Sequence, residues 1–196
     1  MILGLDKIQA LIINENPPLI SNLANRELFN PEGTGIDIRA GIFYKVFEND
    51  SGFLENDGNK ERRTPNVVNI SAYQNDLIEV DQSFVTLSYL DYFLVKTIER
   101  FAVPIKLAGF IFPRTTLFRS GVQLFSSLVS PGYGIQEGGS TLTFGLINLS
   151  RSPFRIQLGA RIAQIVFMEI DGIATPYRGP WQDNHGKVST DTETQK

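Results

Sequence analysis

The chain has 196 residues, of which 42% are hydrophobic and 20% charged, and its formal net charge is −3. This length and composition are typical of one sizeable globular domain, and the acidic balance excludes an overall field that would favour direct nucleic-acid binding or an anionic membrane. The absence of cysteine excludes disulfides, thiolate catalysis and cysteine-ligated metal, and the single histidine, His185, cannot form a zinc site alone, so we expect a protein of the reducing cytoplasm with no metal held by its own side chains.

A short amphipathic helix is the first predicted element, near residues 6–13. Ile8, Leu11 and Ile12 fall on one face of it at i, i+3 and i+4 spacing. No apolar run in the chain approaches the roughly 20 residues that a membrane-spanning helix needs, so we expect no membrane association.

Strand-like patterns dominate after this helix. Residues 34–47 alternate and are rich in Ile, Phe and Tyr, as expected of a pair of strands. Residues 48–66 are polar and dense in Asn, Asp and Gly, and they predict a long exposed loop that can contain a hairpin. Short strand-like runs separated by Pro or Gly then follow and favour an all-β barrel or sandwich. We expect a single domain over residues 1–182 and a polar C-terminal tail or lid over residues 183–196.

A polar cluster interrupts the apolar pattern in "FPRTTLFRSGV", residues 112–122. If Thr115 or Thr116 begins a short helical turn after a strand, backbone N–H groups and a hydroxyl point toward a site that favours anions. Arg114 and Arg119 add guanidinium donors that match phosphate oxygens. The cluster predicts a cradle for a triphosphate, and the alternative is a capped turn with one exposed and one ion-paired arginine.

Five stretches in order along the chain resemble motifs of the dCTP deaminase/dUTPase superfamily, and more closely its deaminase and archaeal-type dUTPase branch. They are "GTGIDIRAG" (33–41), "YFLVKTIERFAVPIKLAGFIFPRTTLFRSGV" (92–122), "VSPGY" (129–133), "GARIAQIVF" (159–167) and "PYRGPWQDNHGKVS" (176–189). The resemblance implies an all-β, distorted-barrel or jelly-roll-like fold of the dUTPase type with a short N-terminal helix. It also implies a homotrimer whose sites are shared between subunits and closed by a C-terminal lid, with Mg²⁺ held by the nucleotide triphosphate.

The resemblance also implies roles for particular residues. Those expected to bind phosphate are Arg114, Thr115, Thr116, Arg119 and Gln164. Those expected to contact the nucleoside or form the lid are Tyr133, Tyr177, Trp181, Gln182 and Asn184, because rings and amides suit a sugar, a base edge and phosphates. The alternatives are an ordinary turn aromatic at the first of these positions and a C-terminal segment packed by its aromatic rings at the others.

Two positions depart from the family pattern where catalytic carboxylates are expected. In the deaminases a glutamate lies three residues before the asparagine matched here by Asn148, and Gly145 stands in its place, which cannot act as acid or base. In the dUTPases an aspartate precedes the Pro/Ala-Gly-aromatic turn, and Ser130 stands in its place, a poor base without a partner histidine. Asp37 and Glu137 are the candidate catalytic surrogates, although Glu137 is equally explained as a solvated loop charge.

These residues leave three functional hypotheses. The first is an enzyme of nucleotide metabolism acting on dUTP or dCTP, either a diphosphatase in which water attacks the α-phosphorus or a deaminase in which water attacks C4 without zinc. The second is a catalytically inactive homologue that keeps the triphosphate pocket and senses nucleotides or binds a partner. The third, a structural β-domain without a ligand, is disfavoured by the retained arginines, threonines and glutamines. The sequence does not choose between uracil and cytosine.

Overall fold

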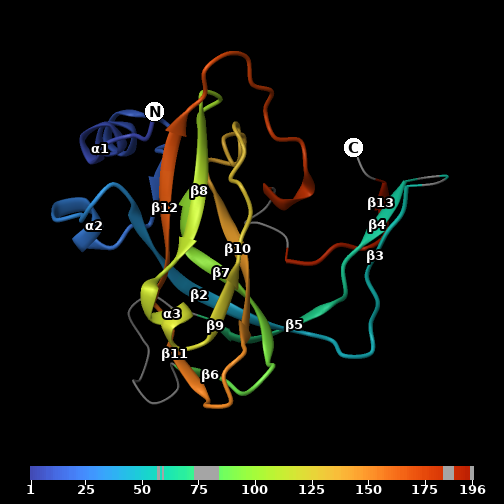
Figure 1. The fold of residues 1–196 in the computed structure, drawn as a ribbon. Helices are drawn as coiled ribbons and strands as arrows, with labels where there is room; N and C mark the ends of the chain where they lie inside the picture. Colours follow the sequence, from blue (N-terminus) through green and yellow to red (C-terminus); the bar gives the residue numbers. More distant parts are fainter. Residues whose placement is uncertain (57, 59, 73–83, 183–187, 195–196) are drawn as a thin grey trace.

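The computed structural model describes residues 1–56, 58, 60–72, 84–182 and 188–194 (Figure 1). The helical elements are α1 (Leu5–Asn14), α2 (Asn25–Phe29), α3 (Thr115–Arg119) and the 3₁₀ helix η2 (Pro180–Gln182). The strands are β1 (Ile20–Ser21), β2 (Ile36–Val46), β3 (Phe53–Leu54), β4 (Glu61–Arg63), β5 (Val67–Ala72), β6 (Phe84–Leu87), β7 (Tyr92–Phe101), β8 (Leu107–Pro113), β9 (Val122–Phe125), β10 (Ser140–Asn148), β11 (Phe154–Gln157), β12 (Arg161–Glu169) and β13 (Glu193–Thr194).

One antiparallel sheet of eight strands forms the body of the molecule. Its strands follow the order β8-β12-β2-β7-β10-β9, with β1 paired to β7 and β5 paired to β2. An isolated bridge between Gly109 of β8 and Val129 joins one edge of the sheet to the segment between β9 and β10 at the other edge. The sheet therefore almost closes on itself, which confirms the predicted all-β, distorted-barrel fold.

The hydrophobic core lies inside this curved sheet. Along β7, the buried side chains Phe93, Val95 and Phe101 alternate with more exposed ones, as the two-residue period of a strand requires. Leu146 of β10 and Phe167 of β12 are fully buried in the same cluster. Each side chain of this kind stabilises the fold by about 1.5–3 kcal/mol through removal of apolar surface from water.

The N-terminal helix is confirmed as α1, one residue longer at each end than predicted. Ile8 is fully buried, and Leu11 and Ile12 pack against the core beside it. In the part of the chain that the structure describes, no helix is both long and apolar enough to cross a membrane.

Residues 34–47 contain one strand, β2, and the expectation of a strand pair is wrong. The chain does not turn at Gly41. Instead, Gly41 allows the backbones of β2 and β7 to approach, since a Cβ there would lie 2.9 Å from the carbonyl oxygen of Lys96. A continuous β2 can therefore pair with β12 near its start and with both β7 and β5 farther along.

The polar stretch 48–66 contains a short hairpin, β3–β4, as the sequence allowed. The C-terminal strand β13 pairs with β4, and Arg62 Nε donates to Glu193 Oε1 at 2.8 Å. Figure 1 shows this small three-stranded sheet standing away from the body on the right. The hairpin thus holds a part of the C-terminal segment that lies far from it in sequence.

A buried ion pair connects the neighbouring strands β2 and β7. The carboxylate of Glu99, which is fully buried, accepts hydrogen bonds from Arg39 Nε at 2.6 Å and from the Arg39 backbone N–H at 2.9 Å. Burial raises the pKa of Glu99, and the bonds from Arg39 oppose that rise. The folded protein therefore holds a proton at Glu99 more tightly than the unfolded chain does.

We expect the contribution of Glu99 to the free energy of unfolding to fall as the pH rises from 4.5, the ordinary glutamate value, toward its folded-state pKa. In this range the unfolded chain releases the proton and the folded state retains it, so a higher pH favours unfolding. Glu99→Gln removes this titration, and its stability should depend less on pH. Urea unfolding of both proteins at several pH values measures the difference, and parallel profiles would contradict the expectation.

Candidate functional site

The predicted phosphate cluster sits where β8 ends and α3 begins. Pro113 closes the strand, and Arg114 occupies the N-cap position in an extended conformation, with φ −66° and ψ 142°. Its backbone N–H donates to the carbonyl of Ile162 in β12 at 3.0 Å, which fixes the start of the turn. The helical turn beginning at Thr115 is therefore confirmed. The side chains of its polar members are exposed, and these are Thr115, Thr116 and Arg119.

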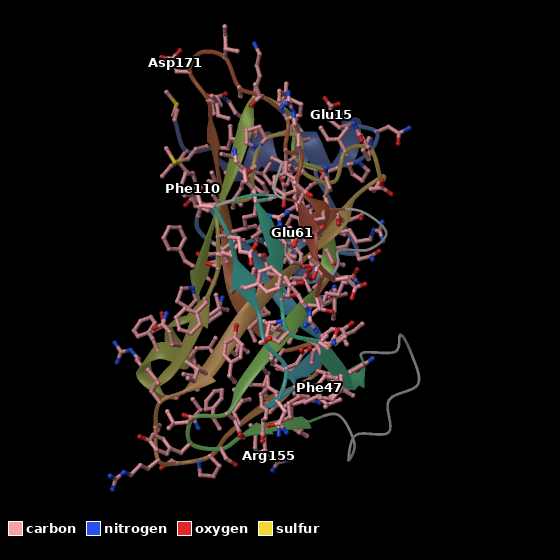
Figure 2. All side chains as sticks on the ribbon, turned by 90° about the vertical axis from the view of Figure 1, so that its right-hand side faces the viewer. Glu15, Phe47, Glu61, Phe110, Arg155 and Asp171 are labelled. Carbon is pink, nitrogen blue, oxygen red and sulfur yellow. The ribbon has the colours of Figure 1, made fainter. Side chains whose placement is uncertain are left out.

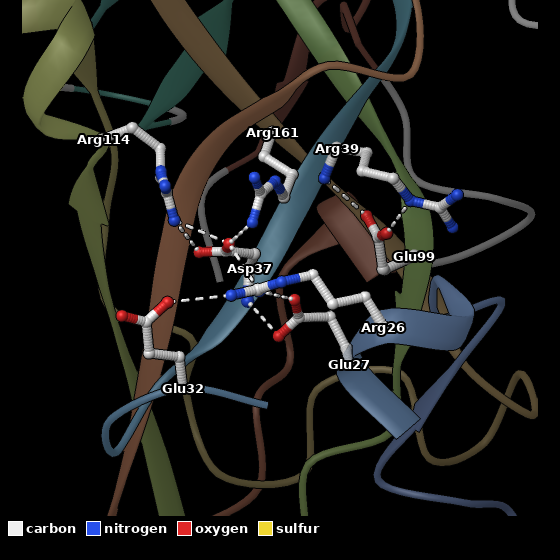
Figure 3. Close-up of polar contacts among 8 residues, drawn as sticks. All are labelled: Arg26, Glu27, Glu32, Asp37, Arg39, Glu99, Arg114 and Arg161. Carbon is white, nitrogen blue, oxygen red and sulfur yellow. Dashed lines mark hydrogen bonds and ion pairs between the residues drawn. The ribbon is translucent and has the colours of Figure 1, made fainter. Parts of the chain in front are cut away.

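Asp37, one of the two candidate catalytic surrogates, lies at the centre of an arginine cluster (Figure 3). Its carboxylate is 3% exposed and accepts from Arg114 Nη1 at 2.5 and 2.6 Å and from Arg161 Nη1 at 2.8 Å. Arg26 Nη1 of α2 approaches the same carboxylate at 3.4 Å. Both oxygens of Asp37 are thus engaged by guanidinium groups, a geometry that neutralises its charge and positions the arginines.

Two glutamates complete this cluster on the side of α2. Glu27 is buried, accepts from the backbone N–H of Asp37 at 3.1 Å and pairs with Arg26 Nη1 at 2.5 Å. The exposed Glu32 pairs with Arg26 Nη2 at 2.9 Å. Arg26 therefore pairs with three carboxylates, whereas Arg114 and Arg161 contact Asp37 through Nη1 alone.

Gln164 joins this cluster through the sheet register. It lies opposite Asp37 in the pairing of β12 with β2 and opposite Phe112 in the pairing with β8. Its side chain crosses over Gly35, where a Cβ would lie 2.5 Å from Gln164 Cγ. The structure thus brings together Asp37, Arg114 and Gln164, which are far apart in the sequence.

A separate pocket of about 510 Å³ lies beside β7 and β10. Its lining is Val46, Thr64, Pro65, Tyr92, Leu94, Ile111, Ser127, Leu128, Val129, Ser130, Tyr133, Leu142, Thr143, Phe144, Tyr177, Trp181 and Val188. Among the described residues, no Asp, Glu, Lys or Arg lines it, and the predicted phosphate residues do not line it either. The volume suits a small organic ligand, and the lining favours an uncharged ring over a phosphate group.

Three of the residues predicted for the nucleoside and lid, Tyr133, Tyr177 and Trp181, line this pocket. The hydroxyl of Tyr133 donates to the carbonyl oxygens of Thr141 at 2.7 Å and Trp181 at 2.9 Å, as a bifurcated contact. The rings of Tyr133 and Tyr177 lie 5.5 Å apart at 57°. The backbone N–H of Gly134 donates to Gln182 Oε1 at 3.1 Å. The hairpin turn and the C-terminal segment therefore form one wall of the pocket within a single chain.

The other predicted positions lie as follows. Ser130 lines the pocket, whereas Glu137 is exposed at the tip of its turn and is absent from the lining. Gly145 lies in β10 beneath the ring of Tyr92. Asn184 falls outside the described residues.

Sequence reasoning missed three residues of these sites, a pair in α2 and one tyrosine in β7. Arg26 and Glu27 lie in α2, in a stretch without a recognisable motif, and only the fold brings them to Asp37. Tyr92 opens a strand and was assigned no role, because its proximity to Gly145 depends on the pairing of β7 with β10. Neither feature has a signature in residue spacing.

The fold and the site define a predominantly β protein that combines an aromatic pocket with a cluster of arginines held by buried carboxylates. The family model described as dCTP deaminase-like matches residues 2–170. The chain belongs to the dCTP deaminase-like family, as the sequence motifs predicted.

Two relatives illustrate the range of names within this similarity. The deoxyuridine 5'-triphosphate nucleotidohydrolase of Methanocaldococcus jannaschii is 29% identical over 167 residues, covering 85% of this chain and 94% of that protein. The dUMP-forming dCTP deaminase of Persephonella marina is 28% identical over 192 residues, covering 97% of this chain and 96% of that protein. The similarity therefore extends over nearly the whole of both relatives.

Among solved structures, the 2'-deoxycytidine 5'-triphosphate deaminase of Agrobacterium tumefaciens matches with a TM-score of 0.59 and 16% identity. The match covers 85% of this chain and 48% of that chain, so this chain spans about half of that protein's length. At this identity the likeness concerns the fold alone, and it supports the predicted all-β architecture.

Proposed function

We propose that the protein binds a pyrimidine deoxynucleoside triphosphate, dUTP or dCTP, and acts on it in nucleotide metabolism. The observation that carries this proposal is the pairing of an uncharged aromatic pocket with a distinct arginine cluster in a member of the dCTP deaminase-like family. The pocket offers rings and hydroxyls to a base and sugar, and the cluster offers guanidinium groups to phosphates.

The phosphate end is proposed to contact Arg114, Thr115, Thr116, Arg119 and Gln164. Arg114 and Arg161 present N–H groups that Asp37 does not use, and the threonine hydroxyls and Arg119 are exposed beside them. Asp37 then serves to hold the arginines in place before the nucleotide arrives, which lowers the ordering cost of binding. Mg²⁺ is proposed to come with the triphosphate and to neutralise part of its charge.

The complete site is proposed to form between subunits of a homotrimer. Two observations support this: the phosphate cluster and the pocket share no lining residue, and phenylalanines are exposed beside the cluster. Phe110 and Phe112 project outward from β8, and Phe118 of α3 and Phe125 of β9 lie nearby in the chain. Phe110 is 37% exposed, and each of the other three is more than half exposed. Figure 2 shows Phe110 at the outer surface of the sheet.

Light scattering should give three times the chain mass of 21.9 kDa. The physical reason is that a trimer contact would cover aromatic surface that a monomer leaves in water. Phe112→Asp places a charge in the proposed contact and should shift the protein toward monomers. If the wild-type protein is a monomer at micromolar concentration, the trimer proposal is wrong, and the description of the fold is unaffected.

A second candidate function is a catalytically inactive homologue that senses nucleotides or binds a partner. The observation that favours it is the lack of a carboxylate in the pocket lining of the described residues. A panel of dUTP, dCTP, dTTP and UTP with Mg²⁺, read by thermal shift and by product chromatography, separates the two. Stabilisation with turnover supports an enzyme, and stabilisation without turnover supports the inactive homologue. If the panel gives no stabilisation and no turnover, nucleotide binding itself is overturned.

Arg114→Ala should weaken nucleotide binding by about 1.5–3 kcal/mol, the typical value of hydrogen bonds to charged groups. The fold should tolerate the change, because Arg161 and Arg26 still face Asp37. Isothermal calorimetry measures the affinity. Arg151→Ala, at an exposed arginine outside the cluster, is the matched control and should bind as the wild type does. Equal affinities for both variants would show that the cluster is purely structural.

A further inference from the structure

The ring of Tyr92 covers Gly145 on the pocket side of the sheet. In the antiparallel pairing of β7 with β10, Tyr92 lies opposite Ile147 and Leu94 lies opposite Gly145, so Tyr92 and Gly145 are diagonal neighbours on one face. A Cβ at Gly145 would lie 2.6 Å from Tyr92 Oη and 3.0 Å from Cε2. The phenol therefore occupies the space that any side chain at position 145 would need.

Tyr92 also lines the pocket with its hydroxyl unengaged. Tyr92, Leu94 and Thr143 line the pocket from β7 and β10, Tyr133 lines it from the turn between β9 and β10, and Trp181 lines it from the C-terminal segment. By contrast with the hydroxyl of Tyr133, which donates to backbone carbonyls, that of Tyr92 makes no hydrogen bond with any residue that the structure describes. Tyr92 is 41% exposed, and its partial burial raises the pKa of the phenol, so the hydroxyl stays protonated at neutral pH and can both donate and accept.

A hydroxyl with no partner among the described residues, at the wall of a largely apolar pocket, is suited to recognise a ligand. The surrounding aromatic side chains match a flat ring, and the absence of charged lining residues in the described part excludes a direct ion pair there. A pyrimidine has the required shape and carries carbonyl, amino and ring-nitrogen groups at its edge. This step rests on the proposed nucleotide function.

We propose that Tyr92 is a recognition residue for the pyrimidine ring, which it contacts through a hydrogen bond from or to its hydroxyl. Glycine at position 145 serves this role by leaving room for the phenol. Tyr92 thus fills, with a neutral hydroxyl, the space in which position 145 could otherwise hold a side chain. The consequence is a pocket arranged to bind the ring rather than to move protons on it.

Tyr92→Phe should weaken binding of dUTP or dCTP by roughly threefold to tenfold, the usual effect of one neutral hydrogen bond. It should leave the affinity for inorganic triphosphate and the thermal stability of the free protein unchanged, since the hydroxyl has no partner among the described residues. Calorimetry with the three probes measures this. Tyr89→Phe, at an exposed tyrosine outside the pocket, is the matched control and should show no loss.

A second pair of variants tests the space above Gly145. Gly145→Ala displaces the phenol and should weaken nucleotide binding in the wild type, but it should have little further effect in a Tyr92→Ala background. If the wild-type protein binds the nucleotide and Tyr92→Phe binds it equally well, the role of Tyr92 is wrong and the proposed function stands. If the wild-type protein binds neither dUTP nor dCTP at millimolar concentration, both the proposed function and this inference are wrong.

Discussion

Asp37→Ala should lower the free energy of unfolding by about 3 kcal/mol, the lower end of the range for breaking a buried ion pair. The carboxylate is 3% exposed, and its removal leaves Arg26, Arg114 and Arg161 facing one another without their shared counter-charge. The lower end applies because the three guanidinium side chains are 36–39% exposed and water screens part of their repulsion.

Chemical denaturation in urea measures this loss, with Asp171→Ala, an exposed aspartate outside the cluster, as the control. The control should change the free energy of unfolding by less than about 0.5 kcal/mol. The experiment also separates two roles for Asp37. Unchanged stability together with lost turnover of dUTP would make Asp37 a catalytic surrogate, whereas lost stability supports its role in positioning the arginines.

Deamination of dCTP should be slower by about 10²–10⁴-fold than in an enzyme with a positioned acid–base group, or absent. Attack of water at C4 requires a group that takes a proton from the water and passes one to N3 and the leaving amine. Gly145 lies beneath Tyr92, and among the described residues the pocket lining contains hydroxyls but no carboxylate. Ser130 lines the pocket without a histidine partner among those lining residues.

Chromatography of the products after incubation with dCTP and Mg²⁺ tests this expectation, and rapid formation of dUTP or dUMP would contradict it. Cleavage of dUTP to dUMP and diphosphate is a separate question, because phosphoryl chemistry depends strongly on positioning and charge neutralisation. Glu137 remains a proposed surrogate for that reaction. If dUTP alone is cleaved, Glu137→Gln and Asp37→Asn, assayed separately with Glu55→Gln as an exposed control, identify the group that orients the water.

Local patterns in the sequence predicted much of the fold. The face formed by Ile8, Leu11 and Ile12 predicted α1 to within one residue at each end, since helical periodicity is a local property. The polar composition of residues 48–66 allowed for the hairpin β3–β4. The strand pair expected over residues 34–47 was wrong, because alternation and β-forming composition do not show how many strands a stretch contains. Gly41 lies within one strand, where it allows close approach to β7.

The sequence by itself determined the all-β class, the N-terminal helix, a helical turn beginning at Thr115 or Thr116 and, through ordered motifs, the dCTP deaminase-like family. Only the tertiary structure decided how the polar residues are used. It placed Asp37 among three arginines from α2, the start of α3 and β12, and it laid Tyr92 over Gly145. Spacing along the chain encodes local periodicity and turns, but ion pairing and side-chain overlap depend on strand register between segments far apart in sequence, which no local pattern specifies.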